Sequence, residues 1–74
     1  MKVVIDTVVV GSMEQTSKKT GKPYSVVTFM DDTTPVIALY KGDIGEIELC
    51  QPCTLVVDVN LKYKDVRVSE WKKA

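Results

Sequence analysis

The sequence contains no histidine, and it has only two cysteines, one tryptophan and one phenylalanine among its 74 residues. Without histidine, general acid or base catalysis would fall to carboxylates. The adjacent pair Asp31 and Asp32 precedes Thr-Thr-Pro, which is a turn sequence, because aspartate side chains bond to their own backbone and proline restricts φ. We therefore expect a protein that is not an enzyme.

Long hydrophobic runs and an excess of charge are also missing. The segment from Val3 to Val10 is apolar but interrupted by Asp6 and Thr7, and it is far shorter than the ~20 residues of a membrane span. We therefore expect a soluble, cytoplasmic protein without a membrane partner. Ten basic residues balance ten acidic ones, so attraction of the whole molecule to a polyanion is weak. Any binding of nucleic acid must come from charge that is segregated on the surface.

The two cysteines stand in the pattern Cys50-Gln51-Pro52-Cys53. Redox catalysis favours a first cysteine at a helix N-terminus, where the thiol pKa falls, whereas a strand is predicted to follow here. Zinc needs four ligands, so a site would have to be pooled from two copies of the chain. The other interpretation is structural, with two small apolar side chains on either side of a turn. We predict neither a metal nor a cofactor.

Alanine is scarce while branched apolar residues, valine above all, are abundant, a composition typical of β-sheet. Alternating apolar residues predict strands over residues 2–13, 24–31, 36–41, 54–61 and 66–71. Gly11 indicates a bulge that would let the first strand serve both halves of a curled sheet. The one short helix is expected within residues 42–49, with Asp43 as its N-cap.

The same alternation assigns side chains to faces. In the fourth strand it predicts that Leu55, Val57, Val59 and Leu61 point inward. Phe29 is expected in the core, and Tyr40 suits either the barrel wall or a base-stacking surface. Trp71 shares an outward face with Arg67 and Ser69 if alternation holds, although a tryptophan near a terminus more often seals the domain or a dimer interface.

Five strands with a helical connection between the third and fourth are the layout of the OB-fold, a five-stranded Greek-key barrel. Closure of the barrel would remove most of the exposed sheet edge. An SH3-like barrel is the nearest competitor. We therefore expect an all-β OB-fold forming a single domain over residues 1–74.

Cationic and aromatic residues coincide at two predicted turns. Lys18, Lys19 and Lys22 lie in a loop that leads directly to Tyr24. Single-stranded nucleic acid is bound by cations that contact phosphates and by aromatic rings on which unstacked bases stack. The predicted phosphate contacts are Lys18, Lys19, Lys22, Lys64 and Arg67, and the predicted stacking residues are Tyr24 and Tyr63. RNA would satisfy the same requirements as DNA.

The run Thr20-Gly21-Lys22-Pro23-Tyr24-Ser25, with the acidic turn and Pro35-Val36-Ile37 after it, resembles the filamentous-phage gene-five family of single-stranded DNA-binding proteins. The similarity is closest from Gly21 to Ser25, and Gly-Lys-Pro-Tyr also occurs in other single-stranded DNA-binding OB-folds. The resemblance implies a homodimer that coats DNA without sequence specificity during replication of a phage or another mobile element. A phage-encoded protein would act in the host cytoplasm.

Carried over to this chain, the resemblance places Lys22 and Tyr24 in the DNA groove. It also makes Tyr63 the hairpin aromatic that reaches bases near the partner subunit. Thr34 stands where the family often has a tyrosine, so one stacking surface is absent. Lysines 18 and 19 replace common arginines, which keeps the charge but loses the planar bidentate fork.

A different function class remains open for the same fold. An OB-fold or SH3-like barrel can serve as a protein-interaction or assembly module that binds no nucleic acid. In that case Trp71 and the apolar strand edges would form the interface.

Overall fold

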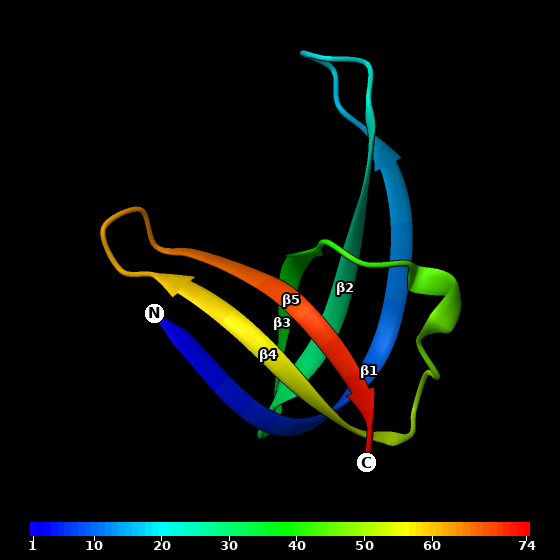
Figure 1. Ribbon diagram of the computed structural model, residues 1–74, viewed down its shortest axis with the longest axis vertical. Coiled ribbons are helices and arrows are strands. Elements are labelled where there is room, and N and C mark those ends of the chain that lie inside the picture. The colour runs from blue at the N-terminus through cyan, green and yellow to red at the C-terminus, as the bar shows by residue number, and fades with distance from the viewer.

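The computed structural model describes all residues from 1 to 74, and its five strands form one closed barrel in the order β1-β2-β3-β5-β4 (Figure 1). The strands are β1 Lys2–Thr16, β2 Pro23–Asp31, β3 Thr34–Tyr40, β4 Pro52–Asn60 and β5 Asp65–Lys73. All neighbours are antiparallel except β3 and β5, which are parallel. The predicted all-β class is confirmed, and the barrel is consistent with an OB-fold.

The connection between β3 and β4 holds a single 3₁₀ turn, η1, over Ile44–Glu46. Asp43 is its N-cap and accepts a hydrogen bond from the Gly45 N–H at 2.8 Å, as the sequence predicted. The helical segment is shorter than residues 42–49 allow, because Ile47 already has extended backbone angles. No helix in the structure has the length and apolar character that a membrane crossing requires.

Strand β1 closes the barrel by pairing with two different neighbours. Its residues 2–8 pair with β4 and its residues 9–16 pair with β2. The register with β2 shifts between Val9 and Gly11, so Val10 has no partner there. A bulge of this kind bends a strand and increases its twist. The bulge predicted at Gly11 is confirmed, and β1 extends three residues beyond the predicted end, to Thr16.

The core is one cluster of buried side chains drawn from every strand. Its members are Val9, Val27, Phe29, Ala38, Tyr40, Cys53, Leu55, Val57 and Val68. The predicted burial of Phe29 is confirmed, and Tyr40 belongs to the barrel wall rather than to an outer surface. Val27 and Phe29 point inward on β2, so the alternate residues from Tyr24 to Met30 face outward.

Leu61 does not point into the barrel, and that prediction is wrong. Strand β4 ends at Asn60, whose side-chain oxygen accepts hydrogen bonds from the N–H groups of Lys62 and Tyr63. This capping ends the strand one residue before Leu61, which is the first residue of the turn and is 73% exposed. Leu55 and Val57 are buried as predicted, and Val59 is partly buried against the core.

The outward orientation predicted for Trp71 is also wrong. In the pairing of β5 with β4, Val68 lies opposite Val57 and Glu70 lies opposite Val56, so Ser69 is an extra residue. One extra residue reverses which face the following side chains occupy. Trp71 therefore lies opposite Leu55 and packs against the core, as a tryptophan that seals the domain would do.

The ionisation of the Tyr40 hydroxyl makes the stability of the fold depend on pH in the alkaline range. Burial raises the pKa of its hydroxyl above the ordinary 10.0, and the carboxylates of Glu46 and Asp43 raise it further. The folded protein therefore holds this proton more tightly than the unfolded chain. The resulting stabilisation is complete below about pH 10 and is lost as the pH rises through the raised pKa.

We expect the Tyr40→Phe variant to lose less stability than the wild type when the pH is raised from about 9 to about 11, because it has no hydroxyl to ionise in the barrel. Urea unfolding followed by tryptophan fluorescence at several pH values measures the difference. Parallel decreases in the free energy of unfolding for both proteins would contradict this prediction.

Candidate nucleic-acid interface

The three loop lysines lie at the end of a projecting arm formed by β1 and β2 (Figure 1). Two backbone hydrogen bonds close the loop: the Ser17 N–H donates to the Lys22 carbonyl and the Gly21 N–H donates to the Ser17 carbonyl, both at 2.9 Å. Gly21 has a φ of +70°, a conformation that L side chains rarely adopt. Lys18, Lys19 and Lys22 are all exposed, so their ammonium groups are available to phosphates.

Tyr24 lies on the outer surface of this arm, directly opposite Gln15 of β1. Its hydroxyl donates a hydrogen bond to Gln15 Oε1 at 2.5 Å, and 37% of the residue is exposed. The hydrogen bond holds the end of the ring, while the exposed area leaves part of it open to a stacked base. Only Pro23 separates Tyr24 from Lys22, so an aromatic ring and a cation stand together.

Tyr63 occupies the turn between β4 and β5 and is 70% exposed. The Lys62 ammonium lies 5.4 Å from the centre of its ring, within cation–π range. Lys64 follows with a positive φ of 51°, which reverses the chain into β5. The hairpin therefore presents one ring with two neighbouring cations.

Arg67 is on the outer surface of β5, where Asp65 partly neutralises it. Its Nε donates to Asp65 Oδ2 at 2.7 Å, and both side chains remain substantially exposed. Asp58 lies opposite Arg67 on β4. The ion pair uses Nε, so the terminal Nη groups are left for a phosphate.

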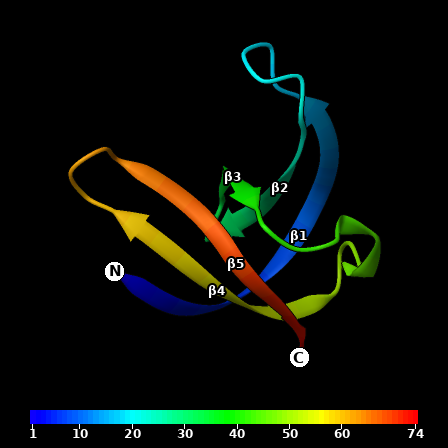
Figure 2. The same ribbon diagram turned by 45° about the horizontal axis from the view of Figure 1, so that its top comes forward.

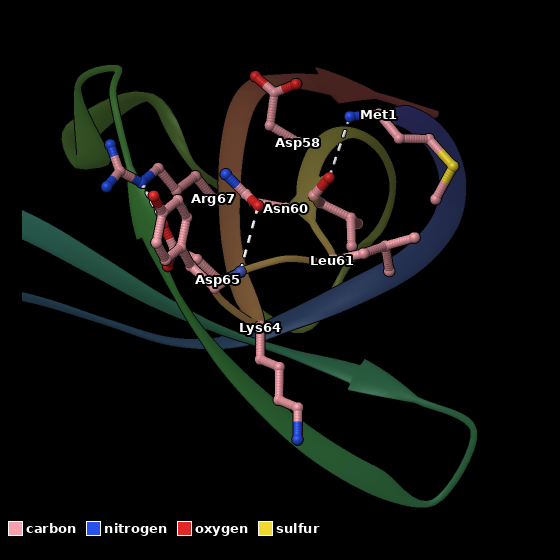
Figure 3. Close-up of a pocket in the computed structure, with 9 residues that line it drawn as sticks. Met1, Asp58, Asn60, Leu61, Lys64, Asp65 and Arg67 are labelled. Carbon is pink, nitrogen blue, oxygen red and sulfur yellow. Dashed lines mark hydrogen bonds and ion pairs between the residues drawn. The ribbon is translucent and has the colours of Figure 1, made fainter.

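A hollow of about 890 Å³ lies beside the β4–β5 hairpin (Figure 3). Its lining residues are Met1, Asp58, Val59, Asn60, Leu61, Tyr63, Lys64, Asp65 and Arg67. Figure 3 shows the Lys64 side chain pointing away from Arg67, so these two predicted phosphate contacts do not form a single cationic centre. Two aspartates in the lining further limit the positive potential there.

The two predicted groups of residues do not meet at one point. In Figures 1 and 2 the β1–β2 and β4–β5 hairpins project in different directions, and in the sheet order β3 lies between β2 and β5. A single strand of nucleic acid that contacts both hairpins has two routes, because the barrel is closed and β1 also pairs with β4. The route that passes Tyr24 crosses the outer surface of β2 and β3. The tips of the hairpins would then hold its phosphates at either end.

This outer surface also contains apolar residues that our sequence-based prediction of the site missed. Ile37, in the middle of β3, is 71% exposed, and it lies opposite Thr28 of β2. Met13 of β1 lies opposite Val26 and is exposed as well. The available signal was alternation in β3, which places Ile37 on the face opposite to Val36 and Ala38.

The two cysteines occupy different environments. Cys50 is exposed and has a positive φ of 61°, whereas Cys53 is buried and its thiol donates to the Thr7 carbonyl at 3.4 Å. A ligand set pooled from two copies would require Cys53 to leave the core. No group of three or more histidine, cysteine, aspartate or glutamate side chains converges in the structure.

Scans of protein-family models, curated proteins and solved structures found no match to this chain. The structure supports one part of the resemblance to the gene-five family, which is the small five-stranded barrel. Membership of that family stays a prediction based on the residues from Thr20 to Ser25 and on Pro35-Val36-Ile37.

Proposed function

We propose that this protein binds single-stranded DNA without sequence specificity and coats it, without catalysing a reaction. The lysines of the β1–β2 arm contact phosphates, and Tyr24 and Tyr63 stack on bases. The observation that carries the proposal is the position of Tyr24, which lies on the outer surface beside the cationic loop rather than in the core. The resemblance to the gene-five family adds a homodimer acting in phage or mobile-element replication in the host cytoplasm.

Local charge makes this binding possible in a protein whose net charge is zero. Lys18, Lys19 and Lys22 share one exposed loop, while Asp43, Glu46 and Glu48 lie in the connection between β3 and β4. Each phosphate that a lysine neutralises releases condensed cations, so log K falls with log salt by roughly 0.7 per contact on single strands. The proposed binding is therefore strongly salt-dependent.

The direct test is fluorescence anisotropy with labelled oligonucleotides of several sequences at a series of salt concentrations. We expect binding that weakens steeply with salt and varies little among mixed sequences. Sedimentation of the same samples gives the number of subunits. Absence of binding at low salt to every sequence would refute the proposal.

Single lysine variants identify the phosphate contacts. We expect Lys22→Ala to weaken binding and to reduce the salt slope by about 0.7, the share of one contact on a single strand. The matched control is Lys72→Ala, because Lys72 is also exposed but pairs with Thr54 in the β4–β5 sheet, away from the arm. Equal slopes for Lys22→Ala and the wild type would remove Lys22 from the interface.

The second candidate function is a protein-interaction module with the same barrel. Trp71, which such a module would have used at its interface, packs against the core. The exposed apolar residues of β1 and β3 favour this candidate instead, because contiguous apolar side chains often mark binding surfaces. The anisotropy experiment separates the two functions, since an interaction module binds no oligonucleotide.

A further inference from the structure

A shallow hollow of about 300 Å³ lies on the outer surface of β1, β2 and β3. Its lining consists of Gly11, Ser12, Met13, Gln15, Val26, Thr28 and Ile37. None of these side chains is charged, and three of them are large and apolar. Its volume is at the lower end of the range for small-molecule sites, about 300–1,000 Å³. The hollow therefore suits one small, flat group with both apolar and polar edges.

The floor of the hollow follows from the strand register. Met13 lies opposite Val26, and Ile37 lies opposite Thr28, so side chains of three adjacent strands stand next to one another on one face. Ile37 is 71% exposed, far more than a residue in the middle of a strand that contributes to a core. Contact with an apolar group would remove this surface from water.

The hollow is continuous with the proposed stacking residue. Gln15 lines the hollow and also accepts the hydrogen bond from the Tyr24 hydroxyl. The cationic loop ends at Lys22, two residues before Tyr24. A strand whose phosphates contact these lysines would pass Tyr24 and then bring its next bases over an uncharged, partly apolar surface.

We propose that the hollow binds thymine bases, with the C5 methyl group against Ile37, Met13 and Val26, and thereby favours DNA over RNA. The inference rests on the proposed function and names the base class that the same surface prefers. Apolar contact with the C5 methyl group is an established way to recognise thymine. The hydroxyl of Thr28 and the amide of Gln15 supply donors and acceptors for the polar edge of the base.

Uracil differs from thymine only by this methyl group, which allows a sharp test. We expect the wild type to bind a deoxythymidine oligomer about fourfold more tightly per occupied hollow than a deoxyuridine oligomer of equal length, the effect of burying one methyl group. Anisotropy at a single salt concentration measures both affinities. Equal affinities would overturn the inference and leave the proposed function standing, whereas binding to neither oligomer would refute the proposed function itself.

The Ile37→Ala variant tests the assigned contact. We expect it to bring the ratio of the two affinities close to one and to change deoxyuridine binding little, because only the methyl contact is removed. Differences between the oligomers themselves cancel, since both proteins bind the same pair. The control is Val4→Ala, which truncates an exposed valine on the part of β1 that pairs with β4 and should keep the fourfold ratio.

Two other results would overturn the inference. An Ile37→Ala variant that loses equal affinity for both oligomers would make Ile37 a general base platform rather than a methyl contact. A wild type that sediments as a larger species than Ile37→Ala would show that a second copy of the chain occupies the hollow.

Discussion

The Tyr24→Ala variant should bind single-stranded DNA about 5- to 150-fold more weakly than the wild type at every salt concentration, because one base loses about 1–3 kcal/mol of stacking on an aromatic ring. The salt slope should stay unchanged, since no phosphate contact is lost. This combination distinguishes Tyr24 from the lysines, whose removal alters the slope. Anisotropy titrations at three or more salt concentrations measure both quantities.

Two variants control this experiment. Tyr24→Phe keeps the ring and loses only the hydrogen bond to Gln15, so it should retain most of the affinity. Tyr63→Ala should produce a loss of similar size if the β4–β5 hairpin contacts the same strand. Because Tyr24 is partly exposed, its removal should leave the thermal midpoint nearly unchanged. An unaltered affinity of Tyr24→Ala would make the assigned interface untenable.

The second large effect is a loss of stability, which we expect when a leucine in the core is truncated. Leu55 is 0% exposed and lies between Ile5 of β1 and Trp71 of β5 in the pairing. Truncation of a fully buried leucine to alanine costs about 2–5 kcal/mol, partly because the cavity does not collapse. At roughly 0.05–0.15 kcal/mol per residue, a chain of this length has a total stability of only about 4–11 kcal/mol. We therefore expect Leu55→Ala to lose a large share of the stability of the wild type, about 2–5 kcal/mol of its free energy of unfolding.

The matched control is Leu61→Ala, which makes the same chemical change at a leucine that is 73% exposed. Its stability should stay within about 0.5 kcal/mol of the wild type. Urea unfolding monitored by circular dichroism compares the three proteins. Equal stabilities of Leu55→Ala and Leu61→Ala would contradict the placement of β4 in the barrel.

Much of the barrel could be predicted from local patterns. The period-two alternation identified all five strands, and Gly11 identified the bulge in β1. Asp43 identified the cap of η1. These features depend on residues that are neighbours in the chain, so short stretches of sequence contain them.

The errors occurred where a local rule depended on a distant partner. The extra residue Ser69 reverses the orientation of Trp71, and it becomes visible only when β5 is paired with β4. Leu61 continued the alternation of β4, but the side chain of Asn60 ended the strand before it. Pairing and capping of this kind are set by the whole barrel.

For the candidate interface, too, some features could be predicted from the sequence and others could not. The kinds of residue that suit single-stranded DNA, and the outward position of Tyr24 on its strand, follow from the sequence, because charge, ring and alternation are local properties. Only the tertiary structure decided that Tyr40 is in the core, that the two hairpins lie apart, and that Met13, Val26 and Ile37 form one surface. Each of these features involves residues from several strands. The pairing of the strands brings these residues together, and no single segment of the sequence contains that pairing.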